Sequence, residues 1–192
     1  MKKRFNFFQI LGISLLAVSL GLLLYSRIQA GRAANSCESV IAQMESLLPE
    51  RTVGVPEDFT EMGMPVLQLG KQDFCGLVEV PAFGVKLPIY NNWETGKLTF
   101  FPCRFWGTVY DGSLVLGGAD QDGQFDFCDQ IQNGSYVTVT DMTGSEFTYT
   151  VTRIDRSKNA DAGTLLKEGF DLVLFARDSY SLEYLIVRCN MA

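Results

Sequence analysis

Residues 170–189 read FDLVLFARDSYSLEYLIVRC and contain two apolar runs, 172–175 and 184–188, separated by a short polar segment. Short runs rich in β-branched, aromatic and aliphatic residues and bounded by Asp and Ser are typical of paired strands. A second turn signal lies at Asp141-Met142-Thr143-Gly144, between two runs with many β-branched and aromatic residues, because glycine adopts positive φ without strain. Asn133-Gly134 precedes another run in the same way. Antiparallel strands are therefore expected.

Six further runs have the composition of strands: 65–69, 76–80, 85–90, 113–116, 136–140 and 146–153. Eight short strands predict a mostly all-β domain, either a closed barrel or a sandwich. Helix is scarce here, and only 123–132 and 161–167 are expected to form short helical insertions between strands.

The N-terminus carries one long apolar segment. Residues 7–25 contain no charge and, at ~1.5 Å per residue, nearly span a ~30 Å hydrocarbon core. Three cations precede this segment within residues 1–6, and two follow it, which favours a cytoplasmic N-terminus and an extracellular C-terminal domain. We expect a single-pass anchor in the plasma membrane. A cleaved signal peptide is the alternative, although its apolar region is usually ~7–15 residues and residues 28–30 form a mediocre cleavage site.

Residues 26–64 are predicted to form a stalk. Asn35, with Glu38 three residues later, resembles a helix start, and Pro49 ends the pattern, so we expect a short helix over about 36–48. Its apolar face would contain Val40, Ile41, Met44, Leu47 and Leu48. Residues 50–65 have no periodicity and are expected to form a loop that leads to a domain over 65–192.

Charge is distributed unevenly. The first 32 residues hold five of the sixteen Lys and Arg residues and no acid, so the remainder carries eleven cations against all 22 acids. A surface with this excess of acid repels polyanions, which excludes nucleic acid as a partner. A cationic or neutral peptide remains compatible with it, and so does the simpler reading that the surplus acid keeps the domain soluble.

The sequence does not predict a metal or cofactor site. The chain has no histidine and no C-x-x-C pair, so its five cysteines do not predict a zinc site, and their pairing stays open: Cys37, Cys75, Cys103, Cys128 and Cys189. Four aspartates at 120, 122, 126 and 129 surround Gly123 and suggest calcium, but their spacing is not that of an EF-hand loop. We interpret them as a solvated acidic turn and expect no metal and no cofactor.

Several segments in order resemble sortases: GLVEVPAFGVKLPIY, SLVLGGADQDGQFDFCDQI, FTYTVTRID and FDLVLFARDSYSLEYLIVRC. The resemblance covers about residues 65–190 and implies the eight-stranded sortase β-barrel. Sortases are membrane-anchored cysteine transpeptidases, mainly of Gram-positive bacteria. They cut LPxTG-like sorting signals and pass the acyl group to an amine, so the apolar N-terminal segment agrees with the resemblance.

The catalytic places of that family are altered here. Where sortases read L-V-I-A-G-H, residues 114–119 read LVLGGA, so Ala119 stands in place of the acid/base histidine. Where sortases read L-T-L-x-T-C, residues 172–177 read LVLFAR, so Arg177 stands in place of the nucleophile. The oxyanion arginine matches Tyr184, or Glu183 if the alignment slips by one residue. The resemblance also suggests a peptide groove lined by Asp120, Ala176, Arg177 and Tyr184.

Two functions follow as hypotheses. The favoured one is a pseudoenzyme at the cell surface that binds a sorting-signal-like peptide, a surface protein or an active sortase without cutting it. The alternative is a sortase-type transpeptidase that anchors surface proteins with a displaced cysteine, which an arginine, a lysine or a helix N-terminus would have to activate. We also expect Arg177 to pair with Asp120, because a guanidinium usually seeks a carboxylate, with a solvent-facing Arg177 as the alternative.

Overall fold

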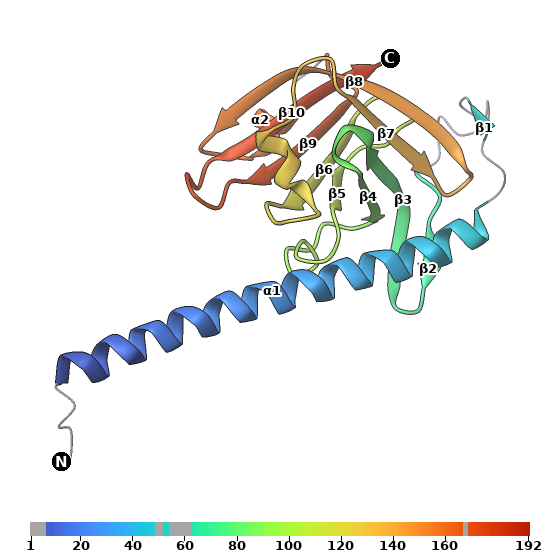
Figure 1. Cartoon of the computed structure of the whole chain (residues 1–192). Helices are drawn as coiled ribbons and strands as arrows, with labels where there is room; N and C mark the ends of the chain where they lie inside the picture. Colours follow the sequence, from blue (N-terminus) through green and yellow to red (C-terminus); the bar gives the residue numbers. More distant parts are fainter. Residues whose placement is uncertain (1–6, 49–51, 54–62, 167–168) are drawn as a thin grey trace.

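The computed structural model describes residues 7–48, 52–53, 63–166 and 169–192. Its body is one sheet that closes on itself, and a long helix lies against the outside (Figure 1). The order β8-β10-β9-β6-β5-β4-β3-β7 returns to β8, so eight strands form the barrel. The predicted mostly-β fold with an eight-stranded barrel is therefore confirmed.

The barrel strands are β3 (Gln72–Val80), β4 (Val85–Tyr90), β5 (Cys103–Trp106), β6 (Leu114–Ala119), β7 (Tyr136–Asp141), β8 (Ser145–Ser157), β9 (Leu172–Arg177) and β10 (Tyr184–Met191). Two short strands extend the sheet: β1 (Thr52–Val53) pairs with β8, and β2 (Leu67–Leu69) pairs with β3. Alternate residues of each strand point inward. The inward set fills the barrel with large side chains, among them Phe74, Leu116 and Leu174, which have no exposed surface.

The strand predictions differ from the structure in two places: one predicted strand lies outside the barrel, and one barrel strand was not predicted. The number of barrel strands is therefore still eight. The predicted run 65–69 became β2, which lies outside the closed barrel. The barrel strand β5 was not predicted, because Pro102 precedes it and a bulge between Arg104 and Trp106 interrupts its alternation. The turn 141–144 formed as expected, with Gly144 at φ 83° and its N–H donating to the Asp141 carbonyl at 3.2 Å.

Two of the short helices were expected, and the 3₁₀ helix η1 (Pro81–Phe83), which joins β3 to β4, was not. Residues 123–132 contain the 3₁₀ helix η2 (Phe125–Asp129). Residues 161–167 contain α2 (Ala162–Leu165), where the Asp161 carboxylate accepts from the Thr164 N–H at 2.8 Å as an N-cap.

A single helix, α1 (Phe7–Leu47), replaces the two helices predicted for the N-terminal part. The predicted start of a separate stalk helix at residue 36 is therefore wrong, because Asn35 lies inside α1. No proline interrupts residues 7–47, so the helix continues through this cap-like signal. By length and composition, its segment Leu11–Ile28 could cross a membrane. The predicted loop 50–65 lies mostly outside the described residues.

The C-terminal part of α1 packs on the barrel. Cys37, Val40 and Met44 are buried there, whereas Leu47, which was expected on the same face, is exposed. The Cys37 thiol donates to the Phe100 carbonyl at 2.9 Å, and Lys86 of β4 forms an ion pair with Glu45 at 2.7 Å. These contacts fix α1 to the barrel beside β4.

Candidate functional site

Strand register brings together the three positions that the resemblance singled out. β6 and β9 run parallel with Ala119 opposite Arg177, and β9 and β10 run antiparallel with Tyr184 opposite Arg177. Residues directly opposite each other on neighbouring strands project from the same face of a sheet. The register places Tyr184, not Glu183, opposite Arg177, so Ala119, Arg177 and Tyr184 form one row across the ends of three strands.

This row lies on the outer face of the barrel. The interior contains Leu116, Leu174 and Ala176, and the alternate residues Val173 and Phe175 belong to a second, smaller buried cluster. Arg177 follows the alternation of that second cluster and is exposed. Ala176, which was expected to line a groove with Arg177, is instead buried in the barrel interior, because neighbouring strand residues face opposite sides.

The expected ion pair between Arg177 and Asp120 is wrong. The Arg177 Nε donates to the Leu182 carbonyl at 3.3 Å, and the Asp120 carboxylate accepts from the Ser179 N–H at 2.7 Å. Both partners belong to the turn between β9 and β10. Each side chain therefore bonds to the backbone of this turn and not to the other side chain. The exposed Arg177 fits the solvent-facing alternative.

The turn between β9 and β10 is organised by Asp178. Its carboxylate accepts from the Tyr180 N–H at 2.7 Å and the Ser181 N–H at 3.0 Å, and Arg156 of β8 pairs with it at 3.1 Å. Hydrogen bonds from the Ser181 and Tyr180 backbone lower the pKa of Asp178 to about 2. The carboxylate is therefore charged at neutral pH, and it keeps its hydrogen bonds to the turn.

Aromatic side chains fill the outer face next to the row. Trp93, from the connection between β4 and β5, packs against Phe105 with ring centroids at 5.2 Å and against Phe175 at 5.6 Å. They meet over Gly117, where an added Cβ would lie 2.5 Å from the Trp93 ring and 2.7 Å from Phe175. The glycine allows this close approach, and the rings occupy the face two residues before Ala119 and Arg177.

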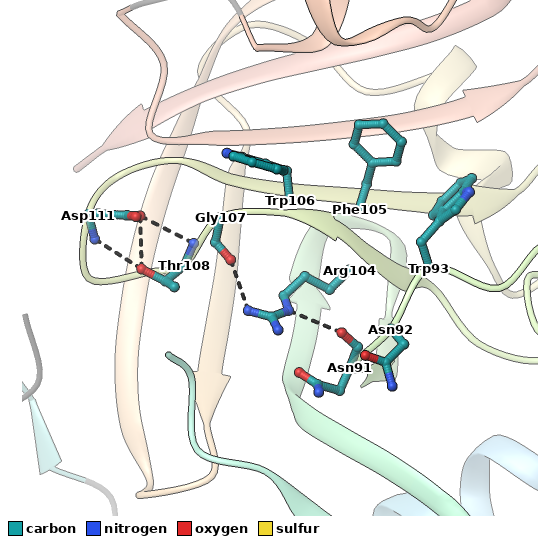
Figure 2. A pocket seen from close by; sticks show the side chains of 9 residues that line it. All are labelled: Asn91, Asn92, Trp93, Arg104, Phe105, Trp106, Gly107, Thr108 and Asp111. Atoms are coloured by element: carbon teal, nitrogen blue, oxygen red, sulfur yellow. Dashed lines mark hydrogen bonds between the residues drawn. The ribbon is translucent and has the colours of Figure 1, made fainter. Parts of the chain in front are cut away.

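Two cavities lie farther from the row, on either side of Trp106. The first, of about 400 Å³, is lined by residues that include Asn91, Trp93, Arg104 and Trp106 (Figure 2). In Figure 2 Trp106 and Phe105 point to one side of the ribbon and Arg104 to the other, where its Nε donates to the Asn91 carbonyl at 3.1 Å. The second cavity, of about 320 Å³, lies between Trp106 and the segment that carries α2. The exposed Trp106 separates the two cavities.

Arg188 of β10 holds the α2 segment in place. Its side chain is fully buried, and the guanidinium donates to the Thr164 carbonyl at 2.6 Å, to the Leu165 carbonyl at 3.4 Å and to Asp155 at 2.8 Å. It also lies 5.1 Å from the Phe170 ring centroid. Positively charged donors at the end of a helix satisfy its last carbonyls. Neither Arg188 nor Trp93 had a sequence signal, because both act through contacts between distant segments.

The acidic turn predicted near Gly123 does not assemble a metal site. Burial and the nearby Asp122 raise the pKa of Asp126. Among the described residues, no three Asp, Glu, Cys or His side chains are grouped so that they could hold a metal ion. The Asp120 carboxylate serves the β9–β10 turn instead.

The comparisons with known proteins agree on one family. Residues 78–182, more than half of the chain, match the family described as Sortase domain. The chain belongs to the sortase family. Sortases are a class of cysteine transpeptidases. The matched region contains Ala119 and Arg177 and ends before Tyr184. No curated protein matches the sequence.

Solved sortase structures share this fold at low sequence identity. Sortase A from Corynebacterium diphtheriae has 16% identity and a TM-score of 0.56, over 91% of this chain and 95% of that one. Sortase D5 from Clostridium perfringens has 17% identity and a TM-score of 0.56, over 83% and 97%. Sortase C1 from Streptococcus agalactiae has 22% identity and a TM-score of 0.51, and the chain spans only 66% of its length. At such identities the likeness shows the sortase fold alone.

The thiols of this sortase-family chain are buried. All five cysteines are free, and none is exposed by more than 5%. Burial raises the pKa of Cys37, Cys75 and Cys189 to about 12 and that of Cys103 to about 11, and it also raises the pKa of Cys128. A thiol with a raised pKa is a poor nucleophile at neutral pH. No described cysteine has the environment of an activated thiolate.

Proposed function

We propose that this chain is a catalytically inactive member of the sortase family that is anchored in a membrane and binds a peptide or a protein without cutting it. One observation carries the proposal: the residue in register between Ala119 and Tyr184 is Arg177, at the place that the resemblance assigns to the nucleophile. A guanidinium cannot attack a carbonyl. The altered residues therefore form one continuous group across three strands.

Acyl transfer needs an activated nucleophile, a group that moves its proton and a donor for the developing oxyanion. The chain contains no histidine, and neither alanine nor tyrosine supplies the other two functions as sortases do. A displaced cysteine would have to ionise, yet burial raises the pKa of all five thiols. These findings favour binding over displaced-cysteine catalysis.

The proposed organisation follows the sequence: residues 1–6 in the cytoplasm, an anchor over 7–25, a connection over 26–64 and an extracellular barrel over 65–192. The exposed apolar span Leu11–Ile28 supports this arrangement. The proposed partners are a sorting-signal-like peptide, a surface protein or an active sortase, and the excess of acidic residues disfavours nucleic acid.

The test uses the full chain in lipid nanodiscs and a library of quenched-fluorescent sorting-signal peptides. The natural chain is compared with Ala119→His/Arg177→Cys/Tyr184→Arg and with a matched control, Ala119→His/Arg177→Ala/Tyr184→Arg. We expect no cleavage by the natural chain or the control, and thiol-sensitive cleavage by the variant with Cys at 177. Cleavage by the natural chain that a thiol-blocking reagent abolishes would refute the proposal.

A further inference from the structure

The turn between β9 and β10 exposes two large apolar side chains. Tyr180 is 98% exposed and Leu182 is 58% exposed. Leu182 also has φ 61°, the only positive φ at a residue other than glycine in the described part of the chain. This conformation is uncommon for a branched aliphatic residue and, when it is maintained, points to a functional constraint.

Hydrogen bonds hold the backbone of the turn that carries both side chains. The turn is closed by the Leu182 N–H, which donates to the Asp178 carbonyl at 3.0 Å, and by the Asp178 N–H, which donates to the Glu183 carbonyl at 2.8 Å. Asp120 of the neighbouring connection holds Ser179 at 2.7 Å. The backbone of the turn is therefore held in place, so contact with a partner would cost little backbone conformational entropy.

The position of the turn follows from the continuity of α1. The apolar span ends at Ile28. Among the α1 side chains that the structure describes, the first that is buried on the barrel is Cys37, nine residues later and about 14 Å along the axis. Figure 1 shows the barrel beside the C-terminal part of α1, with the β9–β10 turn on the side toward the N-terminal half of the helix. The turn therefore points toward the membrane in which α1 would be anchored.

We propose that the turn 178–183 rests on the outer surface of the bilayer and places Tyr180 and Leu182 at the boundary between headgroups and acyl chains. Tyrosine is enriched at this depth because its ring is apolar and its hydroxyl remains hydrated. The inference rests on the anchoring proposed above. It also implies that Ala119, Arg177 and Tyr184, at the strand ends next to the turn, lie near the membrane, so the bound segment of a partner would lie close to the bilayer.

The charges of the turn indicate a neutral lipid surface. Asp178 is paired with Arg156 at 3.1 Å, and the exposed Arg177 lies near Glu183 in the chain, so the turn has no surplus of cations. The body of the protein is acidic, which disfavours attraction to anionic lipids. Contact should therefore depend on Tyr180 and Leu182 and should occur on phosphatidylcholine alone.

The experiment places a nitroxide spin label on the full chain in phosphatidylcholine nanodiscs and measures collisions with oxygen and with a water-soluble nickel chelate. The label is attached at Tyr180→Cys. The matched control is Tyr136→Cys, at an exposed tyrosine that begins β7. Val18→Cys, inside the apolar span, reports on the anchor. The five native thiols are buried, so labelling is selective.

We expect the ratio of oxygen to nickel collisions to be several-fold higher at position 180 than at 136, and highest at 18. Equal ratios at 180 and 136, with a high ratio at 18, would overturn the contact of the turn and leave the anchor intact. A low ratio at 18 would overturn both the anchor and this inference. Tyr180→Ser/Leu182→Ser, labelled at Ser179→Cys, should lower the ratio relative to Ser179→Cys alone.

Discussion

Replacing Gly117 by alanine tests whether Trp93 closes the outer face beside Arg177. The new Cβ would lie 2.5 Å from Cζ3 of Trp93 and 2.7 Å from Cζ of Phe175, closer than carbon atoms approach without displacement. Trp93 is 37% exposed and can move outward, whereas Phe175 is 4% exposed and is held by its neighbours. Overpacking of this kind costs about 1–3 kcal/mol of unfolding free energy.

The contribution of Trp93 is separated by a double-mutant cycle. Truncating a fully buried Trp to Ala costs about 3–5 kcal/mol, and the partial exposure of Trp93 reduces the expected cost of Trp93→Ala to about 2–3 kcal/mol. Gly117→Ala/Trp93→Ala should then cost about 1 kcal/mol less than the sum of the single variants, because the contact with the indole is relieved and the contact with Phe175 remains.

The assay is equilibrium urea denaturation of the full chain in detergent micelles, followed by circular dichroism and by the fluorescence of Trp106, which all four proteins retain. Gly118→Ala provides a reference, because its Cβ would lie 2.3 Å from Cγ of the fully buried Phe125, which has no outward path. Costs of Gly117→Ala and Trp93→Ala that add within about 0.5 kcal/mol would show that Trp93 does not lie over Gly117 and would refute the reasoning.

Three further outcomes follow from contacts elsewhere in the barrel. Arg188→Met should cost about 3–5 kcal/mol in the same denaturation assay, because it removes the donor to Asp155 and to the Thr164 and Leu165 carbonyls; a cost under about 1 kcal/mol would contradict this. Burial opposes ionisation of Asp155, but hydrogen bonds from Arg188 and Arg153 lower its pKa. The stability that the ionised Asp155 contributes to the folded state is therefore present above about pH 4 and is lost as pH falls through this lowered pKa. The urea midpoint should therefore fall less in acid for Arg188→Met than for the natural chain. At about pH 8 a disulfide reagent should react with none of the five thiols until urea unfolds the protein, and rapid reaction in the folded state would reopen displaced-cysteine catalysis.

The sequence predicted those parts of the barrel that depend on local pattern. Residues 85–90 form β4 with the predicted bounds, and the turn at 141–144 formed where glycine relieves positive φ. β5 was missed because Cys103–Trp106 is short and bulged, and pairing with β6 stabilises it more than its own composition does. The continuity of α1 was missed because the capping signal at Asn35 resembles a helix start, whereas no proline interrupts residues 7–47 and the helix continues through it.

For the candidate site, the sequence indicated which residues occupy the catalytic places of the family, but it did not predict the contacts of their side chains. Alignment to the family motifs located Ala119, Arg177 and Tyr184, and the strand register then put them in one row. The partner of Arg177 could not be inferred in the same way. Charge complementarity predicted Asp120 as its partner. In the structure Arg177 instead donates to the backbone carbonyl of Leu182, and Asp120 accepts from the backbone N–H of Ser179. Trp93 reaches the site from a separate connection, and a single sequence does not reveal that contact.

The contacts around Arg177 bear on whether three substitutions can give this chain thiol-dependent cleavage. Arg177 donates to the Leu182 carbonyl, and Asp120 accepts from the Ser179 N–H, so both side chains contact the β9–β10 turn. Trp93 occupies the outer face two residues away, over Gly117. A peptide that reached a cysteine at 177 along the outer face over Gly117 would have to displace Trp93. If Ala119→His/Arg177→Cys/Tyr184→Arg cuts slowly, adding Trp93→Ala should raise the rate while leaving the natural chain inactive. An unchanged rate would place the peptide on a path that avoids Trp93.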